Sequence, residues 1–401
     1  MRSVPTTADD GDKLFLVSQR LVSLDALRGV AALVVLIQHS FLVLPAVYAP
    51  YSNPHVTGIG DLRWWTMYTP FHGLWDGSVA VMIFFVLSGF VLTLPYLGDR
   101  PLDLRSYFPA RLVRLYLPVI VAVLFAAVLI EVMPTAEGWR VSPWVANKPT
   151  ELTGEGVMQD MILLFHPGYT NSAFWSLKWE VIFSLLLPIV IFLCVRKFRG
   201  STALAGAVIT VSLIIGAVVG PTAQTTQMGA FYHLGTFALG SFIAVHWDRI
   251  RRYVAGLSTA IVGVAWAAAL LLVSSYWLVY AFGDLPGQTR LVQAARVIQV
   301  FGAALVIVLV GSGRSAMRAE HPVFVWLGTR SFSLYLVHEP IVVAFGHLMG
   351  RAVVSPYFGI LPGMICALVA AEIFFRLVER PSHLLSRKIS KSITSRVRRT
   401  A

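Results

Sequence analysis

Arg28 and His39 are the two residues whose types and spacing most clearly suggest chemistry. Both lie in the apolar run of residues 24–40, L-D-A-L-R-G-V-A-A-L-V-V-L-I-Q-H-S. In a helix, a separation of eleven residues puts both side chains on one face, roughly 17 Å apart along the axis. Ionisable side chains are costly inside a bilayer and usually mark a functional site. The structural alternative is an arginine that reaches the interface and a histidine satisfied by a neighbouring helix.

Further arginines follow in the segment R-L-V-R-L-Y-L-P, residues 111–118. Arg111 and Arg114 are three residues apart and therefore share one face of a helix. Together with Arg105 and Arg28 they could form a cluster that binds a phosphate-bearing ligand, because guanidinium groups bind phosphate in a bidentate manner. The alternative is that these arginines only anchor the helix in the membrane.

Other polar residues lie within apolar runs. Ser88 precedes Gly89 in F-F-V-L-S-G-F, where small residues usually allow two helices to approach closely; substrate binding is the alternative. Tyr335 and His338 belong to S-F-S-L-Y-L-V-H-E-P, in which Pro340 frees a backbone carbonyl that a neighbouring helix or a cavity must compensate. Ser88, Tyr335 and His338 are candidate substrate-binding residues, although His338 is also explained as a packed polar residue.

The composition indicates an integral membrane protein. Of the 401 residues, 57% are hydrophobic, and mean hydropathy is +0.72. Only 13% of the residues are charged, against about 25% in soluble domains. Repeated apolar runs near 20 residues indicate helices rather than a barrel. The two cysteines, Cys194 and Cys366, each lie in an apolar run, so we expect neither a disulfide framework nor a metal site.

The apolar runs predict an all-α polytopic bundle of about ten transmembrane helices. The predicted spans are residues 24–46, 74–97, 110–133, 174–195, 202–219, 229–247, 254–282, 291–312, 332–349 and 357–378. We expect three parts: a cytoplasmic N-terminal segment (residues 1–20), a transmembrane domain (residues 21–380) and a basic cytoplasmic tail (residues 381–401) that holds to anionic lipid.

The basic residues predict the orientation. Lys and Arg fall mostly in alternate loops and in the tail, so the positive-inside rule places both termini in the cytoplasm of a multi-pass cell membrane protein. This distribution explains the net charge of +12 without nucleic acid as a partner. Two long outer loops, residues 48–73 and 134–173, could cover a site or form aromatic belts at the interface, for example through Trp139 and Trp144.

This orientation suggests a partner for His39. Glu180 lies about six residues into its span from the outer side, and His39 lies about 15 residues into the first span from the inner side. Both therefore fall in the outer half of a core of about 30 Å. A buried carboxylate that orients a histidine is the usual partner of a general base. The alternative is a Glu180 that pairs with Lys178 or is solvated at the interface.

Six segments, in order along the chain, resemble the acyltransferase-3 family of integral membrane O-acyltransferases. They are D-A-L-R-G-V-A-A with its following histidine (residues 25–39), F-F-V-L-S-G-F (84–90), R-x-x-R-L-x-x-P (111–118), W-S-L-x-x-E (175–180), S-F-S-L-Y-L-V-H-x-P (331–340) and E-R-P (379–381). The resemblance covers nearly the whole chain. It implies an enzyme that transfers an acyl group, commonly acetyl, from cytoplasmic acyl-CoA to a hydroxyl of a carbohydrate or glycosylated small molecule.

The resemblance also implies roles for single residues. The family's essential arginine and histidine correspond to Arg28 and His39, and its paired arginines to Arg111 and Arg114. We hypothesise that the three arginines hold the CoA phosphates while the thioester reaches His39. The imidazole would then take the proton of the acceptor hydroxyl while Glu180 orients the ring. Many polysaccharide-modifying members continue into an outer hydrolase-like domain, and we expect none here, because only a short tail follows Pro381 in this sequence. The acceptor therefore stays open among smaller glycans, lipid-linked sugars and secondary metabolites such as macrolides.

A proton-coupled transporter is the alternative class of function. In that case His39, Glu180 and His338 would form a proton relay across the membrane. Transporters are often built from inverted repeats with broken helices at corresponding positions. We find no convincing internal repeat, and Pro188 and Pro340 do not occupy corresponding positions in two halves. The residues therefore favour the enzyme.

Overall fold

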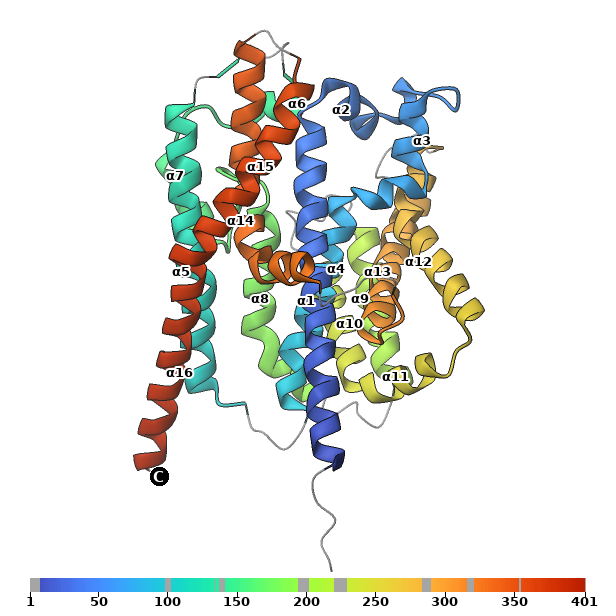
Figure 1. The fold of residues 1–401 in the computed structure, drawn as a ribbon, viewed down its shortest axis with the longest axis vertical. Helices are drawn as coiled ribbons and strands as arrows, with labels where there is room; N and C mark the ends of the chain where they lie inside the picture. Colours follow the sequence, from blue (N-terminus) through green and yellow to red (C-terminus); the bar gives the residue numbers. More distant parts are fainter. Residues whose placement is uncertain are drawn as a thin grey trace, which may run out of the picture.

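The computed structural model describes residues 8–97, 102–133, 135–136, 141–193, 202–219, 229–282, 290–315, 321–352 and 355–400. These residues form helices and connecting segments, with no β-strand among them (Figure 1). The predicted fold class, an all-α polytopic membrane protein, is therefore confirmed.

Ten apolar helices within the described residues form the bundle. Eight are long and apolar enough to cross a membrane: α1 (Ala8–Leu42), α4 (Gly77–Thr93), α5 (Leu104–Val132), α8 (Phe174–Ile191), α12 (Thr259–Tyr280), α13 (Arg290–Gly311), α14 (Pro322–Arg351) and α15 (Tyr357–Phe374). Two shorter apolar helices are α9 (Thr202–Val219) and α10 (Gly229–Val245). Each of the ten predicted spans coincides with one of these helices.

One clear difference in a boundary is at the start of α14. The predicted span begins at residue 332, but the helix begins at Pro322, with His321 as its N-cap. The extra turns contain Arg330. The predicted span begins after this residue because a charged side chain interrupts the apolar run. In the structure this guanidinium pairs with Glu372 of α15 at 2.7 Å, so its charge is compensated by the neighbouring helix.

Two glycines bring α1 and α14 into close contact. A Cβ atom on Gly29 would lie 2.5 Å from the backbone nitrogen of Gly328, and one on Gly328 would lie 2.5 Å from the carbonyl oxygen of Asp25. A side chain at either position would push the helices apart. This close approach sets His39 against the second half of α14.

Glycine plays the same part between α4 and α10. A Cβ atom on Gly89 would lie 1.9 Å from the carbonyl oxygen of Phe237, and one on Gly240 would lie 1.9 Å from that of Val86. The close approach predicted for this segment therefore occurs at Gly89. Ser88, one residue earlier, lines a pocket instead.

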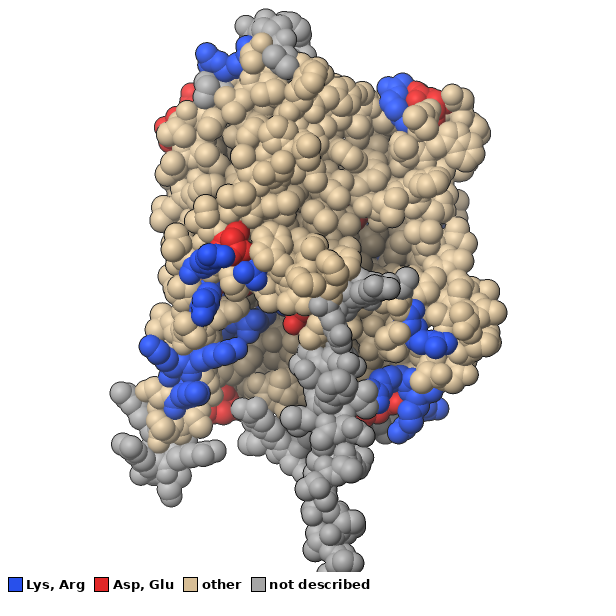
Figure 2. Space-filling view, viewed as in Figure 1, with Lys and Arg blue, Asp and Glu red and all other residues tan. Residues whose placement is uncertain are grey.

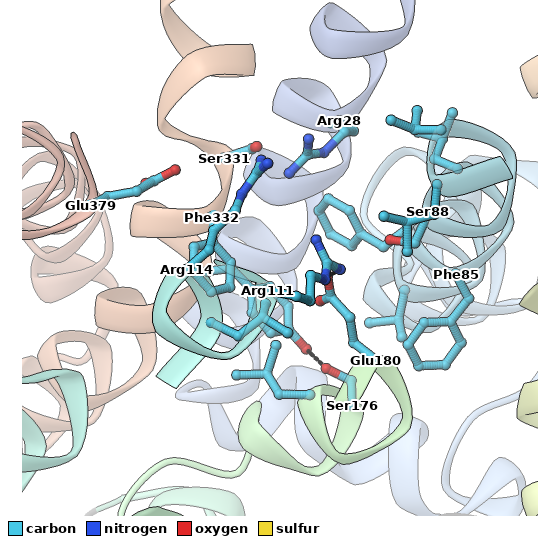
Figure 3. A pocket seen from close by; sticks show the side chains of 18 of the residues that line it. Arg28, Phe85, Ser88, Arg111, Arg114, Ser176, Glu180, Ser331, Phe332 and Glu379 are labelled. Carbon is cyan, nitrogen blue, oxygen red and sulfur yellow. Dashed lines mark hydrogen bonds and ion pairs between the residues drawn. The ribbon is translucent and has the colours of Figure 1, made fainter. Parts of the chain in front are cut away.

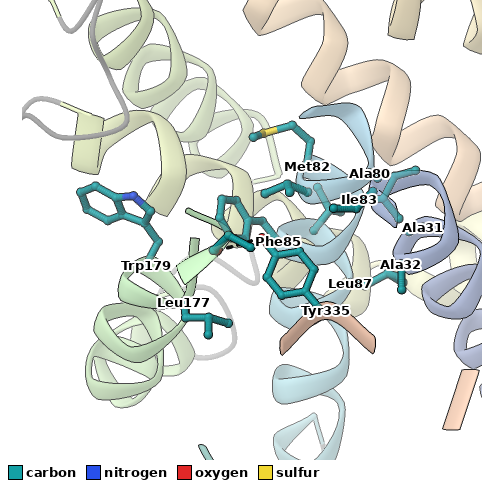
Figure 4. Packing of buried hydrophobic residues seen from close by; sticks show 14 of the residues in the cluster. Ala31, Ala32, Ala80, Met82, Ile83, Phe85, Leu87, Leu177, Trp179 and Tyr335 are labelled. Carbon is teal, nitrogen blue, oxygen red and sulfur yellow. Dashed lines mark hydrogen bonds between the residues drawn. The ribbon is translucent and has the colours of Figure 1, made fainter. Parts of the chain in front are cut away.

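The core is a large apolar cluster that runs through most of the bundle. Figure 4 shows part of it, where Ala31 and Ala32 of α1 face α4 near Ala80 and Leu87. Small residues on α1 let α4 approach closely. The first helix is consequently held between α4 and α14, and its polar residues project into the spaces beside these two contacts.

Four short helices lie at one end of the bundle, at the top of Figure 1. They are α2 (Pro45–Ser52), α3 (Leu62–Tyr68), α6 (Pro143–Ala146) and α7 (Gly154–Ile162). In the first long loop, Trp64 and Tyr68 are buried against Trp277 in a second apolar cluster, so they do not form an interfacial belt. Trp139, one of the expected belt residues, lies outside the described residues.

The start of α1 and the end of α16 (Arg380–Thr400) lie together at the lower end of Figure 1, which we call the terminal end. Helix α11 (Trp247–Ala255) lies there too. Figure 2 shows Lys and Arg side chains gathered toward this end, over α16 and near α11. The predicted tail is thus largely helical, and the hydroxyls of Ser382 and Ser386 bond carbonyl oxygens of α5.

Candidate active site

His39 and His338 form the centre of a buried polar cluster. Nδ1 of His39 lies 3.0 Å from Nε2 of His338, and the two rings stack with centroids 5.0 Å apart. On its other side, Nδ1 of His338 lies 3.0 Å from the carbonyl oxygen of Leu334 and 2.9 Å from that of Tyr335. His338 is completely buried. The predicted candidates His39 and His338 are therefore brought together.

For two neutral rings, this hydrogen-bond pattern assigns the tautomers. A carbonyl oxygen can only accept, so Nδ1 of His338 carries the proton, and Nε2 of His338 must accept. Nδ1 of His39 then donates to it. The proton of His39 is thus on Nδ1, and its Nε2 keeps the lone pair that a general base needs.

Glu339 supplies the carboxylate of the cluster. Its Oε2 lies 3.5 Å from Nδ1 of His39, and its Oε1 lies 2.5 Å from Nζ of Lys148. The backbone N–H and hydroxyl of Ser172 donate to it at 2.9 and 2.7 Å, and the backbone N–H of Ala173 at 3.1 Å. Glu339 is 1% exposed. A buried charge requires such pairing and hydrogen bonding.

The second long loop, residues 134–173, contributes directly to this cluster. The ring of Trp144 lies 5.1 Å from that of His39, and Nζ of Lys148 lies 4.4 Å from the same indole ring. The hydroxyl of Ser142 donates to the carbonyl oxygen of Leu42 at 2.5 Å, which fastens the loop to the end of α1. The sequence left open whether this loop covers a site or forms an aromatic belt at the interface. Trp144 packs against His39 and therefore covers the cluster.

A separate pocket lies nearer the terminal end. It has an empty volume of about 940 Å³, and we call it the arginine pocket (Figure 3). Arg28, Arg111 and Arg114 extend into it from α1 and α5, so the predicted cluster of these three arginines is present. Ser88 and Tyr335 also line it. Arg105, expected in the same cluster, is exposed and lines no pocket that we identify in the described chain.

The arginine pocket opens toward the terminal end through a second hollow. This hollow has an empty volume of about 1070 Å³ and shares Arg111 and Arg114 with the arginine pocket. Helix α16 forms one of its walls with Ser386 and Ser390. A ligand can therefore extend from the arginines toward the basic end of the molecule.

Glu180 does not contact His39, and this part of the predicted site is wrong. Its Oε1 accepts a hydrogen bond from Arg111 at 2.8 Å, and it lines the arginine pocket. The carboxylate beside His39 is Glu339. The depth estimate failed because α8 does not begin at the surface: the loop before it descends into the bundle, where Ser172 meets Glu339. Glu180 consequently lies nearer the terminal end than a count from the surface suggests.

The same observation removes the predicted proton relay. His39 and His338 are hydrogen-bonded, but Glu180 is bonded to Arg111 instead of either histidine. The relay of His39, Glu180 and His338 on which the transporter alternative depended is not assembled in the structure.

Tyr335 separates the histidine cluster from the arginine pocket. Its hydroxyl lies 2.7 Å from that of Ser176 and donates to the carbonyl oxygen of Ala173 at 3.0 Å. Its ring lines the pocket and lies 5.8 Å from the ring of His338. A ligand that extends from the arginines to His39 must therefore displace or pass this side chain.

The sequence reasoning missed Glu339, Lys148 and Trp144 as members of the site. Glu339 directly follows His338, and that adjacency was a usable signal. Trp144 was named only as part of a loop that could cover a site, and Lys148 had no signal, because the path of this loop depends on tertiary packing. Among the described residues, no group of three or more His, Cys, Asp or Glu side chains could hold a metal ion.

A family model described as an acyltransferase domain matches residues 21–375. This match and the helical bundle define the class. The chain belongs to the acyltransferase-3 family and is a multi-pass membrane protein.

Three relatives illustrate the family. The chain is 25% identical over 370 residues to O-acetyltransferase OatA of Staphylococcus aureus (strain NCTC 8325 / PS 47), a match that covers 82% of this chain and 58% of that protein. It is 28% identical over 338 residues to acyltransferase MdmB of Streptomyces mycarofaciens, covering 78% and 82%. It is 26% identical over 340 residues to the putative peptidoglycan O-acetyltransferase YrhL of Bacillus subtilis (strain 168), covering 76% and 50%. The chain thus spans little more than half the length of OatA. No solved structure matches it.

Proposed function

We propose that this chain is a membrane O-acyltransferase that moves an acyl group, in the first instance acetyl, from acyl-CoA to a hydroxyl of a carbohydrate or glycosylated metabolite. The observation that carries the proposal is the hydrogen-bond pattern that leaves Nε2 of His39 unprotonated. The printed names of the relatives, O-acetyltransferase and acyltransferase, support the reaction class. The glycan acceptor rests on the name of YrhL.

The arginine pocket supports acyl-CoA as the donor. CoA carries phosphates at one end and the thioester at the other. Arg28, Arg111 and Arg114 offer three guanidinium groups to the phosphates; Arg111 pairs with Glu180 at 2.8 Å, and Arg28 lies 3.9 Å from Asp25. Arg28 and His39 lie roughly 17 Å apart along α1. An extended pantetheine arm would cover this distance, with the phosphates at Arg28 and the thioester at His39. With both termini cytoplasmic, the pocket opens toward the cellular supply of acyl-CoA.

The proposed acyl transfer uses His39 as the general base. The acceptor hydroxyl oxygen attacks the thioester carbonyl carbon while Nε2 of His39 takes the hydroxyl proton. A carbon–oxygen bond forms, and the carbon–sulfur bond then breaks. The CoA sulfur leaves with the proton that His39 returns, so the ring ends neutral. Glu339 lies close enough to Nδ1 of His39 to stabilise the transient imidazolium.

Purified full-length protein and radiolabelled acetyl-CoA test the proposal. We expect release of free CoA and labelling of the acceptor when muropeptides or a macrolide glycoside are added. His39→Ala should lower the turnover about 10²- to 10⁴-fold, the range for loss of a general base. His166→Ala is the matched control, because His166 is exposed in the loop before α8. Full transfer by folded His39→Ala protein would refute the assignment of the base.

A further inference from the structure

A third pocket lies in the other half of the bundle, between α4, α10, α12 and α13. It has an empty volume of about 760 Å³. Phe85 on the wall of the arginine pocket and Trp175 on the wall of this one, with ring centroids 6.2 Å apart, separate the two spaces. We call this space the Arg296 pocket. The lining residues that matter here are Arg296 and the aromatic residues Tyr51, Trp175, Tyr232, Tyr276 and Trp277.

Arg296 has no acidic partner among the described residues. It lies in α13, about 9 Å along the axis from the first residue of that helix. Its guanidinium packs over the ring of Tyr276 at 5.0 Å, and the described chain offers it neither an ion pair nor a hydrogen-bond acceptor. By contrast, Arg111 pairs with Glu180 and Arg330 pairs with Glu372. An arginine left without a carboxylate in a membrane helix is expensive and marks a functional site.

The Asp76 carboxylate, whose partners Ser78 and Trp277 line the pocket, is occupied elsewhere. Asp76 accepts hydrogen bonds from the backbone N–H of Ser78 at 2.9 Å and from the indole N–H of Trp277 at 2.8 Å. It therefore caps the start of α4 and orients Trp277, one wall of the pocket. The charge of Arg296 remains available to a ligand.

Several other polar groups of the pocket can donate to a ligand. Within the described chain, the hydroxyls of Tyr51 and Tyr276 and the indole N–H of Trp175 have no hydrogen-bond partner. A tyrosine hydroxyl is protonated at neutral pH, and burial, followed by the Asp76 carboxylate, raises the pKa of Tyr51 further, so its O–H is a donor throughout that range. The hydroxyl of Tyr232 donates to the carbonyl oxygen of Arg296 at 3.0 Å and holds the α13 backbone in place.

This combination selects a ligand by its chemistry. One full positive charge and several unpaired donors favour an oxyanion, to which guanidinium binds in a charge-assisted, bidentate manner. Aromatic walls favour a flat or ring-shaped body of moderate size. A neutral ligand would leave the charge of Arg296 unbalanced.

We propose that the Arg296 pocket binds a small organic oxyanion, a carboxylate or phosphate attached to a ring-sized body, through the Arg296 guanidinium and the hydroxyls of Tyr51 and Tyr276. The oxyanion belongs either to a free solute, such as a sugar phosphate, or to a lipid headgroup. The site is separate from the proposed acyl transfer, and its occupation can be measured without any transfer activity.

Equilibrium dialysis of the purified full-length protein tests the soluble source. The probes are radiolabelled α-D-glucose 1-phosphate and D-glucuronate, with D-glucose as the neutral control. We expect saturable binding of the two anions and at least tenfold weaker binding of glucose. Native mass spectrometry with dihexanoylphosphatidylglycerol tests the lipid source. Binding of the lipid alone would identify a headgroup site, and binding of the sugar anions would identify a solute site.

Variants locate the binding within the pocket. Arg296→Gln should weaken anion binding at least tenfold, and Tyr276→Phe should weaken it a few-fold. Arg290→Gln is the matched control, because it removes an exposed arginine from the same helix. Arg296→Lys keeps the charge and serves if the glutamine variant does not fold; it should bind more weakly because the planar fork is lost. Equal affinity of Arg296→Gln and the unmodified protein, or no saturable binding of any probe, would overturn the proposal.

Discussion

The histidine cluster and the arginine pocket are both built on α1, yet they differ in how far their polar groups are satisfied. In the histidine cluster, His338 and Glu339 find every main partner inside the protein, and each is at most 1% exposed. In the arginine pocket, three cations face an open space, and Glu180 is the one carboxylate within 3 Å of them in the described chain. Under the proposed function, this difference suits the first site to a chemical step and the second to binding an anionic ligand.

This contrast predicts that changes in the cluster affect stability and turnover, and that changes in the pocket affect donor binding. Glu339→Gln should have the largest effect. It leaves the buried Lys148 charge without its partner, which costs about 3–5 kcal/mol. We expect a lower melting temperature in detergent and loss of acyl transfer.

A double variant separates the two effects of this change. Glu339→Gln combined with Lys148→Met removes both charges and should recover much of the melting temperature, but not the turnover. A single variant that melts and turns over like the unmodified protein would show that the ion pair has neither role.

His338→Leu should lower the turnover about 10²-fold while leaving the dissociation constant for acetyl-CoA unchanged. The reason is that Nδ1 of His39 loses its nearer acceptor, and the tautomer with a free Nε2 is then favoured only by Oε2 of Glu339 at 3.5 Å. His338→Gln offers an amide oxygen at a similar position and should retain more activity. Equal turnover of the leucine and glutamine variants would argue against control of the tautomer.

Arg111→Lys and Arg114→Lys should raise the dissociation constant for acetyl-CoA about tenfold and leave the turnover at saturating donor nearly unchanged. Lysine keeps the charge but loses the planar fork that binds phosphate. Arg105→Lys is the control, because Arg105 is exposed and outside the pocket. Binding isotherms for acetyl-CoA measure this dissociation constant. Unchanged affinity in both variants would indicate that these arginines only anchor the helix in the membrane.

Tyr335→Phe should have the smallest effect. The variant loses the hydrogen bonds to Ser176 and Ala173, worth about 1 kcal/mol each, but keeps the ring between the two sites. We expect a turnover within fivefold of the unmodified protein. Tyr335→Ala, which removes the ring, should change the donor's Michaelis constant more; identical constants for both variants would show that Tyr335 does not restrict the passage.

Much of the bundle was predictable from the sequence, because a membrane imposes a length on each apolar run. The arginine cluster was predictable for a related reason: Arg28, Arg111 and Arg114 lie near the same ends of their spans, and the spacing of the last two puts them on one face. These inferences need only helical geometry and a count of apolar residues.

The histidine cluster was predictable only in part. His39 and His338 were recognised separately, but their contact depends on the packing of α1 against α14 at Gly29 and Gly328. Glu180 was assigned to the wrong partner because helical rise measures depth only from a helix that begins at the surface. The position of Lys148 could not be predicted in this way, because a loop has no periodicity from which the direction of its side chains can be inferred.

The ion pair between Lys148 and Glu339 joins residues 191 positions apart in the chain. Ribosomes add about 5–20 residues per second, so Glu339 is made some 10–40 s after Lys148. During that interval the loop before α8 has no buried carboxylate to hold its lysine. The buried cluster around His39 is therefore completed only when α14 arrives, so it is among the last parts of the bundle to form during biosynthesis.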